Sequence, residues 1–218
     1  MGSDVSFKAV ADEFEAAWND PRHSRFELPA IAVNSKLREK YTVAPSVRMS
    51  RAKLWDMERQ KAWDPASFIP YVVSTGKSWG RHTLKDGTDR FFRSSEQVGW
   101  IDPNVRGTVL EEVLIDNDTQ RIFFMGRAAF PDAAGQLLKA GDFQPLFHVE
   151  HAAAGDAGIA VADVQLQLVG HAVGRAGHER PGEAPVGRAG VDGGAGRGVL
   201  EIAPRDPRAA EAGAEIGG

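Results

Sequence analysis

Large side chains are confined to the first two thirds of this chain. All 18 aromatic residues lie at or before Phe147, and every lysine lies at or before Lys139. From Ala152 to Gly218, nearly half of the chain is glycine or alanine. A large apolar side chain stabilises a fold by roughly 1.5–3 kcal/mol when it is buried. Residues 1–151 are therefore expected to form a single ligand-binding domain that carries the activity.

The tail over residues 152–218 has two open interpretations. Its low complexity predicts a disordered segment. Alternatively, it is an out-of-frame product of GC-rich DNA, because Ala, Gly, Arg, Pro and Val have GC-rich codons. Residues 164–168 alternate in polarity and have the pattern of a further strand. Translating the other reading frames past codon 151 distinguishes the two interpretations.

Composition narrows the class of protein. The net charge is −4 with both signs mixed along the chain, whereas a nucleic-acid binder usually carries a basic stripe. No apolar run approaches the roughly 18 residues of a membrane span, and the N-terminus lacks the pattern of a signal peptide. The chain has no cysteine, which excludes disulfides and a thiolate metal site. We expect a cytoplasmic protein that needs no metal or cofactor.

The order of the predicted elements indicates an α+β fold. Residues 4–18 have helical periodicity, Ser50 caps a second helix, and Asp64-Pro65 begins a short third one. From residue 78 the period changes to two, with a turn at Asp86-Gly87. Strands are then expected at 78–84, 88–98, 107–115, 120–130 and 143–151, preceded by a short one at 41–43; residues 22–40 are ambiguous. Helices followed by successive hairpins predict an antiparallel meander with helices on one face.

Four polar residues on the predicted strands are candidates for acid–base catalysis. His148 shares a strand face with Glu150, and a histidine with its ordinary pKa near 6.5 suits proton transfer. Two adjacent carboxylates at 111–112 point to opposite faces, so one can enter an interior; we select Glu112. Arg93 and Glu96 follow a pair of phenylalanines on the return strand, and an inward arginine binds a carboxylate of the protein or of a ligand.

The structural alternatives for these residues are internal salt bridges and solvated side chains. Five tryptophans are many for packing alone, so part of the aromatic set is expected to line a ligand cavity. The residues predicted to contact the ligand are Trp55, Trp79, His82, Phe92, Phe124 and Phe147.

The chain has no phosphate-binding loop, since Tyr71 stands where that pattern needs its first glycine. It also has no serine-nucleophile elbow and no H-E-x-x-H pair.

The segment VAPSVRMSRAKLWDMERQKAWDPASFIPYV, followed by the long meander, resembles the START-like superfamily, which includes polyketide cyclases and birch-pollen-allergen proteins. The hairpin GTVLEEVLIDNDTQRIFF resembles the central hairpin of that family. The resemblance covers about residues 41–151. Two departures are the additional N-terminal segment before residue 41 and the absence of the family's long C-terminal helix from the Ala/Gly tail. A frameshift would explain the second of them.

The resemblance implies a helix-grip fold around one apolar cavity, with a small apolar molecule as ligand. The function expected is that of a cofactor-independent isomerase, lyase or cyclase acting by acid–base chemistry. The alternatives are a non-catalytic carrier or sensor of an apolar ligand, and an interaction protein whose sheet docks a partner. A homodimer is compatible with each of them, and the sequence does not identify the substrate.

Overall fold

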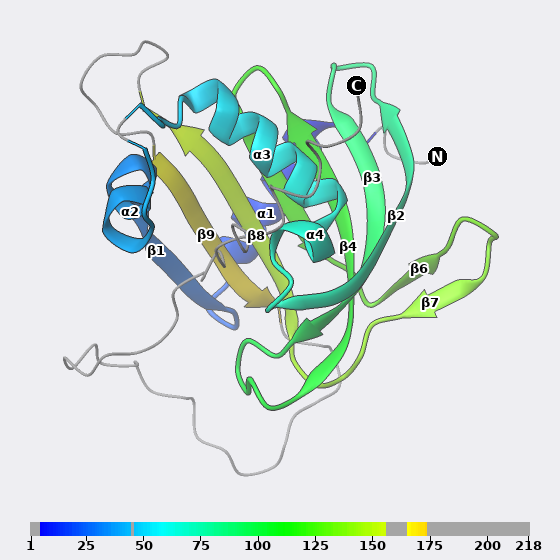
Figure 1. Ribbon diagram of the computed structural model, residues 1–218. Coiled ribbons are helices and arrows are strands. Elements are labelled where there is room, and N and C mark those ends of the chain that lie inside the picture. Colours follow the sequence, from blue (N-terminus) through cyan, green and yellow to red (C-terminus); the bar gives the residue numbers. More distant parts are fainter. Residues whose placement is uncertain (1–4, 45, 156–164, 174–218) are drawn as a thin grey trace, which may run out of the picture. The chain divides into compact units, whose positions relative to one another are not determined.

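The computed structural model describes residues 5–44, 46–155 and 165–173 (Figure 1). All of them belong to one compact unit, Met1–Glu179. The helices are α1 (Phe7–Trp18), α2 (Val33–Lys40), α3 (Arg51–Trp63) and α4 (Pro65–Phe68). The strands are β1 (Ser24–Ala32), β2 (Val73–Thr83), β3 (Asp89–Val98), β4 (Arg106–Asp116), β5 (Arg121–Gly126), β6 (Ala129–Pro131), β7 (Leu137–Lys139), β8 (Leu146–Ala154) and β9 (Gln165–Val173).

Seven of these strands form one antiparallel sheet in the order β1-β9-β8-β5-β4-β3-β2. The predicted α+β class, with an antiparallel meander and packed helices, is confirmed. The sheet extends beyond the expected boundary at residue 151, because β8 continues to Ala154 and β9 pairs with both β8 and β1. The strand expected at 164–168 is therefore present and longer. The rest of the tail lies outside the described residues.

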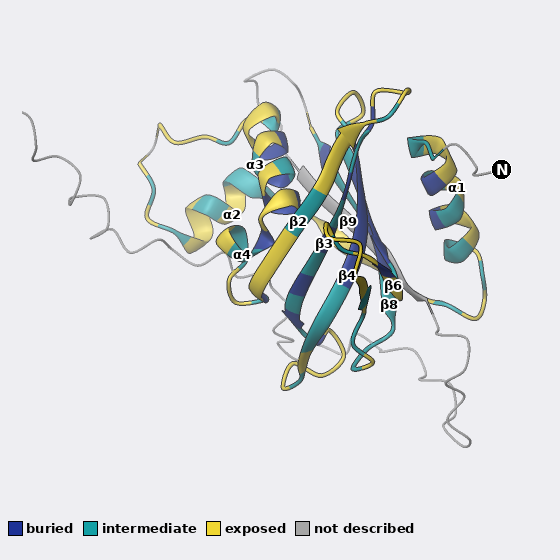
Figure 2. Ribbon diagram, turned by 90° about the vertical axis from the view of Figure 1, so that its right-hand side faces the viewer, coloured by how far each residue is buried: buried dark blue, intermediate teal, exposed yellow. Residues whose placement is uncertain are grey.

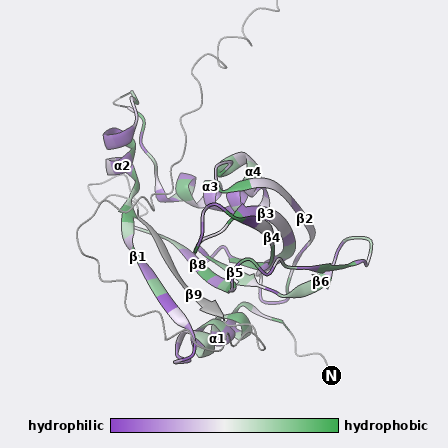
Figure 3. Ribbon diagram, turned by 90° about the horizontal axis from the view of Figure 1, so that it is seen from below, coloured by the Kyte–Doolittle hydropathy of each residue, from purple (hydrophilic) through white to green (hydrophobic). Residues whose placement is uncertain are grey.

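Helices cover both faces of the sheet (Figure 2). Val10 and Phe14 of α1 pack against Leu114, Phe123 and Met125, and we call this side the α1 face. On the opposite side, which we call the α3 face, Leu54 and Trp55 of α3 pack against a second cluster. That cluster contains Phe91, Val113, Ile115, Ile122, Phe124, Val149 and Ala153. The view from below shows α1 on one side of the sheet, with α3 and α4 on the other (Figure 3).

The predicted caps of α3 and α4 are present. The Ser50 side chain accepts a hydrogen bond from the Lys53 amide, and the Asp64 side chain accepts one from the Ser67 amide. Capping satisfies N–H groups that have no partner within the helix. The buried face of α3 also carries two charged residues, Glu58 and Lys61. Glu58 is only 1% exposed, so α3 brings charge into the core.

Three local predictions are wrong. Residues 41–43 form no strand; the first strand is β1, in the segment that appeared ambiguous. The strand expected at 120–130 divides into β5 and β6, which belong to different sheets. The last strand expected from Phe143 begins at Leu146, and β7 was not predicted.

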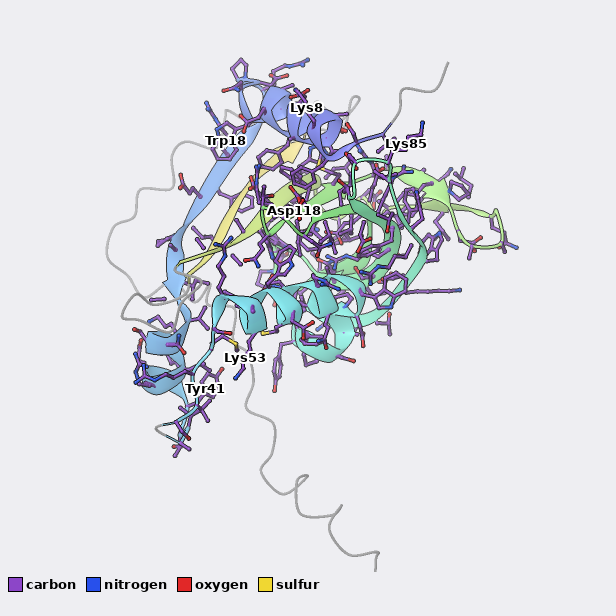
Figure 4. The ribbon with its side chains drawn as sticks, turned by 90° about the horizontal axis from the view of Figure 1, so that it is seen from above. Lys8, Trp18, Tyr41, Lys53, Lys85 and Asp118 are labelled. Carbon is purple, nitrogen blue, oxygen red and sulfur yellow. The ribbon has the colours of Figure 1, made fainter. Side chains whose placement is uncertain are left out.

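The sheet curves toward the α3 face. Phe26 of β1 and Trp100, which follows β3, have ring centroids 5.4 Å apart. Strands β9, β8, β5 and β4 lie between β1 and β3 in the sheet. In a flat sheet these two rings would therefore be several strand spacings apart. Side chains fill both layers between the sheet and the helices (Figure 4, where Lys8 and Trp18 mark α1 and Lys53 marks α3). No helix in the described part of the chain has the length and apolar character to cross a membrane.

Candidate functional site

A buried ion pair stands on the α3 face, where β3 and β4 lie side by side. Arg93 and Glu111 are cross-strand partners, and the Arg93 Nε donates to Glu111 Oε2 over 2.6 Å. Each residue is 7% exposed. The Arg93 Nη1 also donates to the Ala62 carbonyl at the end of α3 over 2.9 Å. Its guanidinium carbon lies 4.5 Å from the centroid of the Phe124 ring, so α3, β4 and β5 together fix this cation.

Glu111 belongs to the wall of a small recess that is partly open to solvent and has a cavity volume of about 40 Å³. The recess lies where β3 and β5 end and β4 and β8 begin. It is lined by Gln97, Trp100, Thr108, Val109, Leu110, Glu111, Gly126, Ala140, Gly141, Phe143, Gln144, Pro145, Leu146, Phe147 and Val149. The site therefore joins aromatic and aliphatic walls to the Glu111 carboxylate, whose partner Arg93 is not among the lining residues. Apolar walls with few polar groups are typical of a small-molecule site.

Two aromatic rings that line the recess, Trp100 and Phe147, form a cluster with Phe26 of β1. Trp100 stacks on Phe147 with centroids 5.2 Å apart, and Phe26 lies 6.4 Å from Phe147. The Trp100 amide donates to the Gln144 side chain over 2.8 Å, which ties the β3–β4 loop to the loop before β8. Trp100 remains 47% exposed. A flat ligand can therefore extend the existing aromatic stack.

Glycine at position 107 sets how closely the Phe143 ring can approach β4. A Cβ atom at Gly107 would lie 2.4 Å from Phe143 Cδ1. We expect Gly107→Ala to displace Phe143 and to lower the free energy of unfolding by about 1–3 kcal/mol, because a packed ring must move. Gly76→Ala is the control, since its new Cβ meets Pro65 at 3.4 Å. Chemical denaturation measures both, and equal effects would contradict this packing.

A second buried polar cluster lies deeper on the α3 face. Lys61 Nζ donates to Glu58 Oε1 over 2.6 Å, and His151 Nδ1 lies 2.9 Å from Glu58 Oε2. The His151 ring meets the Phe124 ring edge-on, with centroids 4.8 Å apart. Phe124 thus stands between the Arg93 guanidinium and the His151 imidazole.

His148 and Glu112 lie on the α1 face, away from the recess. The Glu112 carboxylate accepts from Arg90 and from Arg127, and Arg127 also pairs with Glu13 of α1. These ion pairs are the structural alternative considered for Glu112. Burial is the main cause that lowers the pKa of His148 to about 4; the charge of Glu13 opposes the shift and that of Arg127 adds to it. The catalytic prediction for these two residues placed them in the cavity, and they lie beneath α1 instead.

The other two predicted catalytic residues lie closer to the recess. Arg93 is the cation of the buried pair, and it contacts Glu111 of the recess wall without lining the recess itself. Glu96 accepts a hydrogen bond from the hydroxyl of Thr108, its cross-strand neighbour. Glu96 has the strand parity of Arg90 and so belongs to the α1 side of β3.

Of the six predicted ligand contacts, only Phe147 lines the recess. Trp55 is buried in the core, where its Nε1 donates to Asn117, and Phe124 is also core. Trp79 and Phe92 pack on Phe130 of the small β6–β7 sheet. His82 is exposed on the edge strand β2. Tertiary packing, which a single sequence does not display, decides these positions.

Glu111, Glu58 and His151 are the site residues that the sequence reasoning missed. Two signals were available: Glu111 lies directly opposite Arg93 in the hairpin, and His151 shares a strand face with Phe147. Both follow from strand parity once one face is known to carry the recess. Within the described ranges no three His, Asp or Glu side chains come together in a way that could hold a metal ion.

Comparison with known proteins gives the following. The chain matches no protein-family model and no curated protein. Among solved structures it is similar to the Zhui aromatase/cyclase from Streptomyces sp. R1128, at 14% sequence identity and a TM-score of 0.37. That alignment covers 71% of this chain and 69% of the other.

Proposed function

We propose that this protein binds a small, flat, largely apolar molecule in the recess and acts on it by acid–base chemistry without a cofactor. The observation that carries the proposal is the double role of Glu111, which is paired with Arg93 and also forms part of an aromatic-lined wall. Removing water from around an ion pair strengthens its action on a bound polar group.

In this proposal Glu111 accepts a proton from an acidic C–H or O–H group of the ligand. Arg93 donates to the ligand oxygen on which negative charge develops. Its hydrogen bonds to described residues, those to Glu111 and Ala62, use two of the N–H groups of the guanidinium and leave others to donate. Glu111 then returns the proton to another atom of the same molecule, so an isomerisation or a ring closure needs no further reactant.

The second candidate is a carrier that binds the same class of molecule without turnover. The close Arg93–Glu111 contact of 2.6 Å favours it, because an ion pair already satisfied within the protein can orient a hydroxyl group without exchanging protons. The two candidates share the recess and differ only in whether Glu111 moves a proton.

The test uses 2-tetralone, a flat bicyclic ketone with exchangeable C–H groups next to its carbonyl. We expect saturable binding that perturbs the Trp100 side-chain NMR signals, and accelerated exchange of those C–H groups in D₂O. Glu111→Gln should reduce both the affinity and the exchange rate by about tenfold or more, as for loss of a charged hydrogen-bond partner.

Glu112→Gln is the matched control, because it makes the same chemical change one residue away on the opposite face of β4. It should leave affinity and exchange within about twofold of wild type, because its side chain points away from the recess. Binding without accelerated exchange supports the carrier. Absence of saturable binding, or equal losses in the two variants, overturns the proposed site.

A further inference from the structure

The second polar cluster, Glu58–Lys61–His151, has no place in the chemistry proposed above. It places three ionisable side chains in an otherwise apolar layer between α3 and β8. The Glu58 and Lys61 side chains are 1% and 8% exposed, and that of His151 is 13% exposed. Apolar residues of similar volume commonly stabilise a core as well as such a cluster does, so its presence needs another explanation.

The charge states of this cluster follow from its surroundings. Burial raises the pKa of the Glu58 carboxyl, but Lys61 and His151 outweigh it and lower that pKa to about 2. Burial, together with the charge of Lys61, lowers the pKa of His151 despite the opposing effect of Glu58. At neutral pH the carboxylate is thus ionised and the imidazole neutral, so His151 Nδ1–H donates to Glu58 Oε2 over 2.9 Å.

Two contacts connect this hydrogen bond to Arg93. Glu58 lies on α3 one turn before Ala62, whose carbonyl accepts from Arg93 Nη1. His151 holds the edge of Phe124, and the Arg93 guanidinium lies over the same ring. Two of the three groups that contact Arg93 are therefore linked to this hydrogen bond: the Ala62 carbonyl through Glu58 on α3, and the Phe124 ring through His151.

We infer that the Glu58–His151 hydrogen bond is a positioning device. It holds α3 in register with the sheet, so that Arg93 keeps the Glu111 carboxylate directed at the recess. The role of this geometry in ligand binding rests on the proposed function, but the geometry itself can be tested without it. Glu58 and His151 act through Arg93 and make no contact with the ligand. Positioning groups behind a site commonly decide how well its primary contacts work.

The test compares two double variants that both remove the buried charge. In Lys61→Met/Glu58→Gln, the glutamine carbonyl can still accept from His151 Nδ1–H. In Lys61→Met/Glu58→Leu, that bond is lost while the volume is roughly kept. The readouts are the NMR signal of the Arg93 Nε–H group, the affinity for 2-tetralone, and the midpoint of unfolding.

We expect the glutamine variant to keep the wild-type Arg93 signal and an affinity within about twofold. The leucine variant should shift the Arg93 signal and weaken 2-tetralone binding by about fivefold or more, at a similar midpoint of unfolding. If the two variants give the same Arg93 signal, the positioning role is overturned, even where both are less stable. If wild type itself does not bind 2-tetralone, the proposed function fails, and the Arg93 signal still decides the positioning role.

Discussion

Arg93→Met is expected to lower the free energy of unfolding by about 3–5 kcal/mol, because it leaves the Glu111 carboxylate buried without its counter-charge. Glu111 is 7% exposed, so water at the recess can replace only part of the stabilisation that the guanidinium gives its carboxylate. The substitution also removes the donor to Ala62, which ends the contact between β3 and the last turn of α3. Chemical denaturation at neutral pH measures the loss.

The double variant Arg93→Met/Glu111→Leu separates stability from function. With both charges gone, the free energy of unfolding should return to within about 1 kcal/mol of wild type, as found when apolar residues replace a buried ion pair. Binding of 2-tetralone and exchange of its C–H groups should remain lost in a well-folded protein. A double variant as unstable as Arg93→Met alone would show that the pair stabilises the fold itself, and would remove the main support for a ligand role.

Local signals in the sequence predicted the elements that are made of neighbouring residues. Ser50 and Asp64 cap their helices as expected, and Asp86-Gly87 joins β2 to β3, with Gly87 at a positive φ of 86°. Such signals act within a few residues, so one sequence suffices to detect them. The strand pairs β2–β3, β3–β4 and β4–β5 follow from the same hairpins.

Pairing between distant segments could not be predicted in the same way. Strand β1, the first in the chain, pairs with β9, the last of the described strands. Exposure along β1 does not alternate, so period-two patterning gave no indication of a strand there. A pattern on one strand does not identify its partner, and here the partner lies in a segment of unusual composition.

The same limit explains why the site was only partly found. Strand parity correctly placed His148 and Glu150 on one face of β8, but it does not say which face holds a recess. Helix α1 covers the face of His148, and its Glu13 reaches Arg127. Likewise, Glu58 and Lys61 on a charged helix have the pattern of solvated residues. Their burial depends on β8, which is distant from α3 in the sequence.

His148 is expected to make the fold sensitive to acid. Its pKa is about 4 in the folded state against about 6.5 in an unfolded chain. Between these two values the unfolded state binds a proton that the folded state does not. The free energy of unfolding therefore falls as the pH decreases from 6.5 to 4, by up to about 3 kcal/mol from this one group, and is unaffected by it above 6.5.

Denaturation of wild type and His148→Gln at several pH values between 7 and 4.5 measures this contribution. Glutamine does not titrate, so the variant should lose about 2–3 kcal/mol of the pH dependence across that range. His151 has a pKa lowered by burial and remains in both proteins, so its contribution cancels in the comparison. The carboxyl of Glu58 has a pKa of about 2 and affects stability only below about pH 4.5. Parallel curves for the two proteins would mean that His148 has the same pKa in the folded and unfolded states, because only a difference between these two values makes stability depend on pH. In that case the imidazole would become protonated in the fold below about pH 6.5, and the assignment of this face to structure rather than chemistry would have to be reversed.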